Sequence, residues 1–568
     1  YATLQQSNVI RNGRYRYTNV EWYLADVWKV RPNLTLDFGM RFYFIQPQFD
    51  AALQTSSFNP EFWDPNGVAQ MYQPRINPAT GKSAAFNPVT GEYAPAAMIG
   101  ALVPGTGARI GGAYTNGMAQ AGVNYYPRGL IDNRGVHYAP RLGIAWQVAD
   151  KTVIRTGAGI FYDRFQGNPV FDMLPNPPST LTPTLYYGTL ATIGSTQGVL
   201  FPQNLRGFSR EGKVPTTYQW NFGIQRELPL NVLLDVAYVG SASNHNMMRV
   251  DLNRPGWGAA WNPANTDPTK TYAADGSGAL PVNFLRPYKG AGSIVISTFG
   301  AMSNYNSLQV QLTRRLASGL QAGLAYTWSK ALGTSSFDQG DNGDPQVHPL
   351  GLANNYAPLW FDRRHVLVFN YVYNVPKPAR GGNFLDNPVG RGVFNGWVIS
   401  GITTLQTGAP LAVGFNVQGV SALAREWTGD ETWGPRVALV GNPTPSKRTE
   451  YQWINPAAFA LPAKPSFGNE SATRGYVYGP GLNNWDVSIF KEFPFSSDGQ
   501  RMLQLRLEMF NAPNHVNYNG VNSTITFNRA GQVTNLPVAV GGTDKWGFGR
   551  LNSAADPRII QIAAKLYF

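Results

Sequence analysis

Strict alternation of apolar and other residues runs through segments long enough to cross a lipid bilayer. In residues 34–44, apolar side chains such as Leu34, Phe38 and Phe42 occupy every second position. A period of two places successive side chains on opposite faces of a β-strand. A strand of about ten residues crosses a bilayer when it is tilted by about 45°. The segment therefore predicts a membrane-crossing strand with one apolar and one polar face.

The same alternation recurs along the whole chain. It marks 13 segments, which are 17–30, 33–46, 137–149, 151–165, 215–228, 230–243, 304–316, 319–331, 362–375, 395–409, 483–494, 500–512 and 557–568. Helical periodicity is nearly absent, and no run of about 20 apolar residues could form a transmembrane helix. In hydrocarbon all backbone N–H and C=O groups must be paired, which only helices and closed barrels achieve. We therefore predict an all-β chain, a transmembrane antiparallel β-barrel to which this sequence contributes about 13 strands.

The connections between these segments alternate between short and long. Short ones include Arg31-Pro32 and Ala149-Asp150, and a somewhat longer one spans 376–394. The long ones run over 47–136, 166–214, 244–303, 332–361, 410–482 and 513–556. Outer-membrane barrels have short periplasmic turns and long extracellular loops, whereas a soluble sandwich has no reason to sort its loops. Within 74–96, two Asn-Pro-x-Thr-Gly copies predict a local pair of hairpins.

Composition and aromatic placement favour a wall that meets lipid. Only 14% of residues are charged, against about 25% in typical soluble proteins. Rings near the strand ends suit the headgroup level of a membrane, although a sandwich core is the alternative interpretation. These rings belong to Trp22, Trp28, Trp146, Tyr162, Tyr218, Trp220, Tyr326 and Trp328.

The last segment contains a candidate assembly signal. Ile560, Ile562, Leu566 and Phe568 share one face, and the sequence ends on Phe568. A terminal amphipathic strand that ends in Phe resembles the signal that the barrel assembly machinery of the outer membrane reads. We therefore assign these four residues to that signal and expect the machinery to be a partner.

Several stretches resemble the large TonB-dependent receptors of the Oar-like type, which are abundant in acidobacteria. They include Asp26-Val27-Trp28-Lys29-Val30, Ala237-Tyr238-Val239-Gly240-Ser241, Tyr326-Thr327-Trp328-Ser329-Lys330 and Asn511-Ala512-Pro513-Asn514-His515. The resemblance covers residues 14–568 with gaps at the long loops. It implies the C-terminal barrel portion of a receptor that imports a bound substrate across the bacterial outer membrane. Such receptors carry an N-terminal plug and a TonB box, and we find neither here, so contact with the TonB complex would need a missing N-terminal region.

The strand count leads to a similar expectation about domains. Thirteen is odd, whereas single-chain bacterial barrels have even numbers of strands. If the last strand runs towards the periplasm, residues 1–16 are the end of an extracellular loop. Residues 17–568 are then the C-terminal part of the barrel, and the early strands come from upstream sequence or from another chain.

The sequence offers little chemistry of catalysis or metal binding. There is no cysteine, and no HExxH, G-x-S-x-G, P-loop or G-x-G-x-x-G motif is present. We therefore expect no enzyme, and the substrate-binding residues stay unassigned. Asp338, Asp341 and Asp344 on a Gly-rich segment are weak calcium candidates, with a solvated acidic loop as the alternative. We expect no other cofactor. Lumen-facing charges predict ladders of wall-bracing or plug-facing pairs, with a substrate site as the alternative. They are Arg41, Arg141, Arg155 and Arg506 with Asp37 and Glu508.

The net charge of +13 is spread along the chain without a Lys/Arg block, which argues against nucleic acid as a partner. We expect outer-membrane lipid and lipopolysaccharide around the wall instead. Two alternatives to a receptor remain. One is a surface adhesin or scaffold that acts through the long loops 47–136 and 410–482, and the other is a passive porin.

Overall fold

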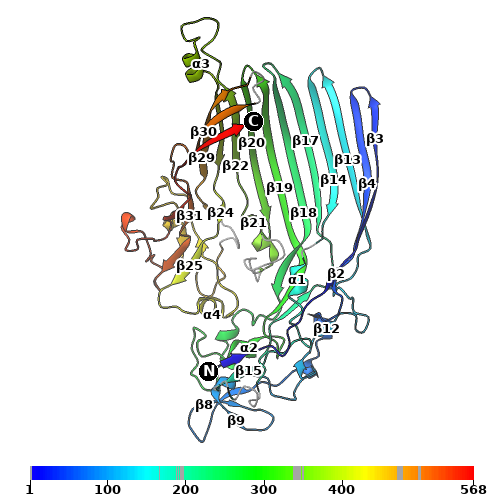
Figure 1. The fold of residues 1–568 in the computed structure, drawn as a ribbon. Coiled ribbons are helices and arrows are strands. Elements are labelled where there is room, and N and C mark those ends of the chain that lie inside the picture. The colour runs from blue at the N-terminus through cyan, green and yellow to red at the C-terminus, as the bar shows by residue number, and fades with distance from the viewer. Residues whose placement is uncertain are drawn as a thin grey trace.

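A curved antiparallel sheet forms the largest part of the molecule (Figure 1). The computed structural model describes residues 3–164, 167–186, 189, 191, 198–336, 347, 351–469, 477–496 and 501–568. Thirteen strands of the sheet follow one path in chain order: β3 (Asn19–Arg31), β4 (Leu34–Ile45), β13 (Val136–Ala149), β14 (Thr152–Tyr162), β17 (Thr216–Leu228), β18 (Val232–Asp251), β19 (Ile294–Ala317), β20 (Leu320–Gly333), β22 (His365–Asn374), β23 (Trp397–Gln406), β29 (Leu482–Pro494), β30 (Met502–Phe510) and β34 (Ile559–Tyr567).

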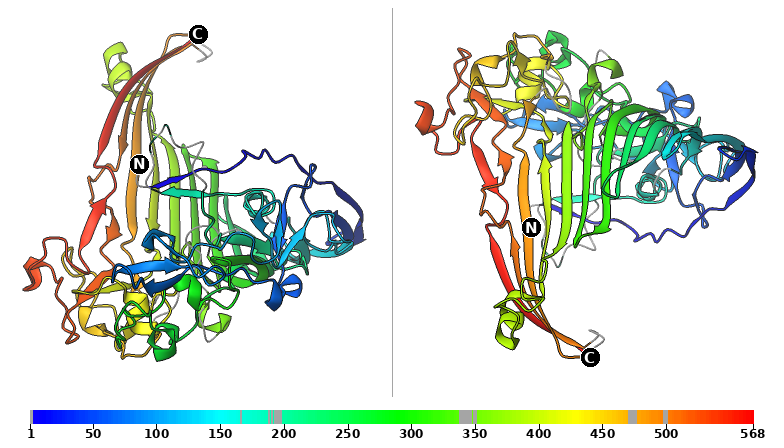
Figure 2. Two further views of the ribbon diagram at one scale, coloured as in Figure 1. Left: turned by 90° about the horizontal axis from the view of Figure 1, so that it is seen from below. Right: turned by 90° about the horizontal axis from the view of Figure 1, so that it is seen from above.

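Each segment in which the sequence alternates overlaps one strand of this path, so the predicted all-β wall is confirmed. The sheet as a whole has 15 strands, because two short strands join it. These are β16 (Leu205–Phe208), which pairs parallel to β19, and β21 (Ala357–Pro358), which pairs with β20. Among the described residues no pairing joins β3 to β34, and the wall is open between them (Figure 2).

Strands β18 and β19 extend well beyond the alternating segments that predicted them. Alternation ends near residue 243, where the register of the pair shifts twice. The extension is stabilised by burial, since Met248, Ile294 and Ile296 are all buried there. Packing between distant segments therefore replaces the local pattern as the cause of the strand.

The register gives the sheet two chemically different faces. Phe38 lies opposite Leu142, Leu142 opposite Ala158, and Ala158 opposite Trp220 on successive strands. Many large apolar side chains of this face are exposed, among them Phe38, Leu142, Trp28, Trp146 and Trp328. We call it the apolar face, and the opposite side, with Arg141 and Asn221, the polar face. An exposed apolar band of this extent is what a barrel presents to lipid.

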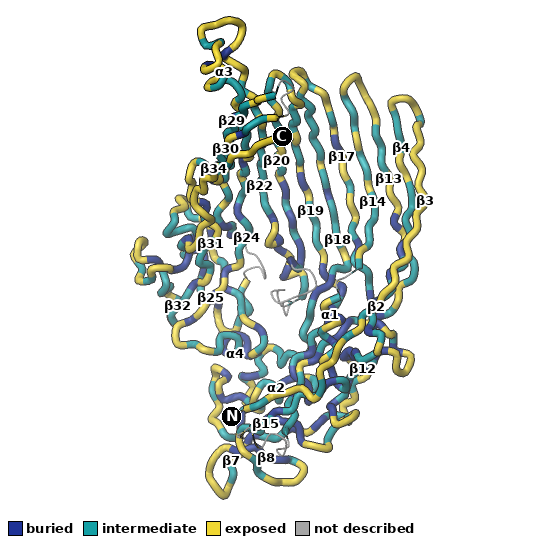
Figure 3. The backbone as a smooth tube through the Cα atoms, viewed as in Figure 1, coloured by how far each residue is buried: buried dark blue, intermediate teal, exposed yellow. Residues whose placement is uncertain are grey.

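The long connections gather at one end of the wall and pack against one another (Figure 1). We call their described residues within 46–135, 163–215, 252–293, 334–364, 407–481 and 511–558 the loop assembly. Much of its chain is buried (Figure 3). It contains three short helices, α1 (Asn168–Phe171), α2 (Val282–Leu285) and α4 (Leu423–Thr428), and the short strands β5 (Phe49–Asp50), β6 (Ser56–Phe58), β7 (Gln73–Ile76), β8 (Ser83–Phe86), β9 (Tyr93–Ala94), β10 (Arg109–Ile110), β11 (Ala113–Tyr114), β12 (Met118–Gln120), β15 (Thr184–Tyr186), β24 (Pro410–Leu411), β25 (Gly414–Val417), β26 (Ala438–Leu439), β27 (Phe459–Ala460), β28 (Val477–Tyr478), β31 (Tyr518–Val521), β32 (Thr524–Phe527) and β33 (Leu551–Ala554).

The loop assembly has hydrophobic cores of its own. The largest joins residues from the connections 407–481 and 511–558, including Phe415, Trp427, Ile525 and Phe548. Others join residues of the earlier connections. The hairpin pair predicted for residues 74–96 is confirmed, because β7, β8 and β9 form a three-stranded sheet.

Two further segments belong neither to the wall nor to the long connections between its strands. At the start of the chain, β1 (Thr3–Gln5) pairs with β15 and β2 (Tyr15–Arg16) pairs with β5, so residues 3–16 lie along the loop assembly. That they end an extracellular loop stays a prediction. At the opposite end of the wall, helix α3 (Pro388–Phe394) lies in the connection between β22 and β23. None of the described helices is long and apolar enough to cross a membrane.

Candidate functional site

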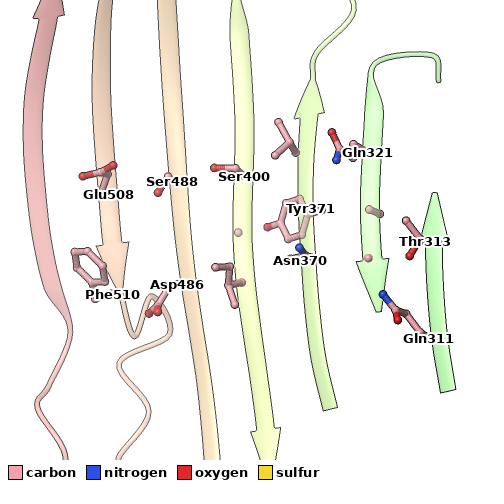
Figure 4. Close-up of a pocket in the computed structure, with 15 residues that line it drawn as sticks. Gln311, Thr313, Gln321, Asn370, Tyr371, Ser400, Asp486, Ser488, Glu508 and Phe510 are labelled. Atoms are coloured by element: carbon pink, nitrogen blue, oxygen red, sulfur yellow. The ribbon is translucent and has the colours of Figure 1, made fainter. Parts of the chain in front are cut away.

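A polar hollow lies on the polar face between β19 and β30 (Figure 4). Its volume is about 580 Å³. The register builds it, because Ser400 lies opposite Ser488 and Ser488 opposite Glu508 on three neighbouring strands. The polar side chains around it are Gln311, Thr313, Gln321, Asn370, Ser400, Asp486, Ser488 and Glu508. The hollow can therefore offer hydrogen bonds to a polar solute along the wall.

One carboxylate of this hollow is held in place from the loop end of its strand. Asp486 Oδ1 accepts hydrogen bonds from Asn484 Nδ2 at 3.0 Å and from the Asn511 backbone N–H at 2.9 Å. No Lys or Arg lines the hollow. Its lining is thus acidic, with Asp486 and Glu508 as the two charged groups.

A second hollow, of about 410 Å³, lies near the other edge of the sheet between β3, β4 and β13. Here the predicted arginines brace the wall. Arg41 Nε donates to Glu21 Oε2 at 3.1 Å, and Arg141 donates to the Tyr43 hydroxyl at 3.3 Å. Asp37 lines the same hollow, so the structure brings Arg41, Arg141 and Asp37 together.

The remaining predicted charges lie apart from that group. Arg506 and Glu508 on β30 approach within 3.8 Å, and Arg506 also donates to the Tyr567 hydroxyl at 3.4 Å. No ion pair joins Arg155 to a residue that the structure describes. Arg41, Arg141 and Arg506 each contact a neighbouring strand, in agreement with the wall-bracing interpretation.

An ion cluster in the loop assembly has no counterpart in the sequence analysis. Glu426 on α4 accepts hydrogen bonds from Lys464 and from Arg529 Nη1, the latter at 2.6 Å. Burial raises the pKa of Glu426, but the hydrogen bonds from Lys464 and Arg529 outweigh it and hold the pKa below its usual value. Lys464 Nζ also lies 3.9 Å from the centre of the Trp427 ring. The partners lie 38 and 103 residues from Glu426, and no sequence signal could have joined them.

Another missed contact bridges two connections of the loop assembly. Arg254 donates to Asp430 Oδ2 at 3.1 Å. Beside it, the backbone N–H of Gly258 donates to the Thr428 carbonyl at 2.9 Å, and the Trp257 and Phe467 rings lie 4.0 Å apart. The connection 252–293 is therefore fastened to the connection 407–481.

The structure describes the residues that were predicted to form an assembly signal, but not those that were predicted to bind calcium. Ile560, Ile562 and Leu566 on β34 lie opposite Met509, Leu507 and Leu503, which places them on the apolar face. All three and Phe568 are exposed, and their reading by an assembly machinery stays a prediction. The calcium candidates Asp338, Asp341 and Asp344 lie outside the described residues. Within the described ranges, no group of three or more His, Asp or Glu side chains is arranged to hold a metal ion.

Comparison with solved structures finds outer-membrane proteins at low sequence identity. The outer membrane transporter YddB from Escherichia coli is 10% identical with a TM-score of 0.42, and the match covers 98% of this chain and 54% of that one. The siderophore receptor PiuA from Acinetobacter baumannii is 8% identical with a TM-score of 0.39, covering 97% and 43%. The ferric-catecholate import receptor Fiu from Escherichia coli K12 is 9% identical with a TM-score of 0.38, covering 98% and 45%. This chain thus spans about half the length of these proteins or less.

No curated protein sequence matches the chain. A family model does, and it describes an outer membrane beta barrel domain. The match runs from residue 1 to residue 561 and so includes the loop assembly and every wall strand before β34. With its two-faced antiparallel wall and sorted connections, the chain belongs to the outer membrane beta barrel domain family.

Proposed function

We propose that the chain is the barrel portion of a TonB-dependent receptor, which takes a bound substrate across the bacterial outer membrane. The observation that carries this proposal is the loop assembly, which packs around its own hydrophobic cores at one end of a polar-faced wall. A passive porin needs only an opening there, whereas a receptor needs a shaped surface that holds a substrate before import. The polar face then gives the substrate a hydrophilic path.

In this proposal the loop assembly faces the outside of the cell and the short turns face the periplasm. The sorting of the connections to opposite ends supports that orientation. Resemblance to the Oar-like type adds the energy source, a TonB complex reached through a region outside this chain. Lipopolysaccharide then surrounds the loop-assembly side of the apolar face.

Because the chain has no cysteine, single introduced cysteines test the orientation without background. Val538 in the loop assembly is 60% exposed, and Phe384 at the opposite end is 88% exposed. We expect a membrane-impermeant maleimide to label Val538→Cys in intact cells and Phe384→Cys only after the outer membrane is permeabilised. Labelling of Phe384→Cys alone in intact cells would reverse the orientation.

Transport itself is tested by following what cells remove from their medium. Mass spectrometry of spent medium would compare wild-type cells, cells without this gene and cells without TonB. We expect one class of solute to stay in the medium of both deletion strains. A solute retained only when this gene is missing would indicate a passive porin. Unchanged uptake with altered cell adhesion would indicate the scaffold alternative.

A further inference from the structure

The connection between β22 and β23 differs from the other short turns. It spans residues 375–396, here called the turn insertion, and it contains α3. The insertion stands at the end of the wall opposite the loop assembly (Figure 1). Its position is fixed by the Trp397 indole N–H, which donates to the Val393 carbonyl at 2.8 Å, and by Val375, whose N–H donates to the Trp397 carbonyl at 2.9 Å.

An open groove of about 760 Å³ separates the turn insertion from the wall. Ile489 lies opposite Leu507, and Leu507 opposite Ile562, so the wall side of the groove belongs to the apolar face. The insertion contributes Val389, Gly392 and Val393. The groove thus opens on the side of the sheet that meets lipid, and its lining is almost entirely apolar.

Lys491 lines this groove, and the turn insertion covers its ammonium group. Lys491 is on the apolar face, where an ammonium group in contact with hydrocarbon is costly. It is only 6% exposed, and its Nζ donates to the Asn395 carbonyl. The rings of Trp397 and Phe493 lie 5.2 and 5.0 Å from the same nitrogen. The insertion therefore shields this cation from lipid and satisfies its hydrogen bonding.

The rest of the insertion combines exposed apolar groups with free cations. Phe384, Val389, Val393 and Phe394 are exposed. Arg391 pairs with Asp386 at 2.6 Å, but Lys377 and Arg380 are exposed and make no ion pair with any residue in the described ranges. Apolar side chains next to unpaired cations are typical of an element that lies at a membrane interface, where lipid phosphates are anionic.

These cations flank Ala379, which is hydrogen-bonded to Asn395 at the end of α3. Ala379 donates its backbone N–H to Asn395 Oδ1 at 3.0 Å and accepts from Asn395 Nδ2 at 2.9 Å. Asn395 is also the residue whose carbonyl binds Lys491. Arg380 follows Ala379 directly and Lys377 precedes it by two residues, so both are close in the chain to the segment that closes the groove.

We propose that the groove binds one acyl chain of a phospholipid, while Lys377 and Arg380 hold its phosphate. The identity of the lipid rests on the proposed orientation, which places the turn insertion in the periplasmic leaflet, where phospholipid and not lipopolysaccharide is present. The groove volume is within the range of about 300–1,000 Å³ that small-molecule sites have. The bound lipid would complete the apolar surface between α3 and the wall.

Gly392 allows a direct test of the apolar part. A Cβ placed on it meets no heavy atom within 4 Å, so Gly392→Leu fills the groove without displacing a neighbour, and leucine favours a helix over glycine. Gly434→Leu is a matched control, since Gly434 lies in the loop assembly with equally open space around its Cβ. Native mass spectrometry of protein extracted from outer membranes in mild detergent would measure the retained phospholipid. We expect Gly392→Leu to retain about tenfold less than wild type and Gly434→Leu to retain as much.

The charged part has a test that leaves the groove intact. In nanodiscs that contain phosphatidylglycerol and phosphatidylcholine in equal amounts, we expect wild type to enrich phosphatidylglycerol at its surface. The double variant Lys377→Gln with Arg380→Gln should lose that preference, because both free cations are gone. Full retention of phospholipid by Gly392→Leu, or a groove that carries lipopolysaccharide or another protein, would overturn the proposal. An unchanged lipid preference in the double variant would overturn the role of the cations.

The outcomes separate this inference from the proposed function. If Phe384→Cys alone is labelled in intact cells but phospholipid stays in the groove, the proposed orientation fails, whereas the binding of an acyl chain by the groove stands. If the labelling follows the proposed orientation and Gly392→Leu changes nothing, the lipid site fails and the receptor proposal stands.

Discussion

Glu426 is a buried carboxylate that depends on two cations from distant parts of the loop assembly. Its side chain is 7% exposed, whereas those of Lys464 and Arg529 are partly open to water. Loss of the carboxylate charge would leave two cations without a partner, but water can solvate them in part. The expected cost is therefore that of charged hydrogen bonds, about 2 kcal/mol, and not that of a fully buried ion pair.

Glu426→Gln tests this at the level of one residue. The pKa of Glu426 is lowered in the folded protein, so the interaction stabilises the fold above the unfolded pKa of about 4.3 and is lost as the pH falls through the lower folded value. Hydrogen exchange at α4 should be faster in Glu426→Gln than in wild type at pH 7. The difference should shrink as the pH falls below the unfolded pKa and vanish once the pH is below the lowered pKa of the folded protein. Glu431→Gln is the control, because its partly exposed pair with Arg425 should contribute less than about 1 kcal/mol. A difference that persists at low pH would contradict the role of the charge.

Between neighbouring strands, one glycine makes room for an aromatic ring of the apolar face. Gly240 on β18 lies opposite Trp220 on β17, and a Cβ placed on Gly240 would come within 2.4 Å of that ring. The Trp220 indole N–H donates to the Tyr238 hydroxyl at 3.4 Å, which donates to Asn306 Oδ1 at 2.6 Å. Three strands thus share this contact near the loop assembly, where an interfacial girdle is expected.

Gly240→Ala should displace the Trp220 ring and destabilise the wall by about 1–3 kcal/mol, the usual cost of overpacking. Urea unfolding of the protein in lipid vesicles, followed by tryptophan fluorescence, would measure the change. Gly143→Ala is the matched strand control, because a Cβ there meets nothing closer than the Asp37 Cβ at 3.6 Å. Equal stability of the two variants would show that the ring has room to move.

The same strands show why the wall was predictable and the rest was not. Alternation along 34–44 or 503–509 predicts both that the segment is a strand and which of its faces meets lipid, because side chains of a strand alternate between faces with a period of two. The turn insertion contains only one short helix, and its three cations, Lys377, Arg380 and Arg391, give no periodic signal. The loop assembly is held by contacts such as the pairing of Phe415 with Ile525, which are distant in sequence and follow no local pattern.

The whole molecule combines a wall in contact with lipid and a loop assembly that folds around cores of its own. The cores form two groups, one in the earlier connections and one in the connections 407–481 and 511–558. The connection 252–293 links these groups, because it contributes residues to the first and is hydrogen-bonded to the connection 407–481. Asp430 is 3% exposed and binds Arg254 across this junction. Its other oxygen accepts from the Thr432 backbone N–H at 2.8 Å, so an asparagine would keep the turn and lose the ion pair.

A double-mutant cycle with Asp430→Asn and Arg254→Gln shows whether the loop assembly behaves as one body. We expect each variant to raise hydrogen exchange in both connections, 252–293 and 407–481, and the double variant to be little worse than either. The coupling energy should be about 1–3 kcal/mol, because the pair is largely buried. The exposed pair between Arg210 and Asp132 is the control and should show coupling below about 1 kcal/mol. If exchange rises only around each mutated residue, the two groups of cores move independently. A substrate held between them would then have to order both groups as it binds, and its affinity would fall by that ordering cost.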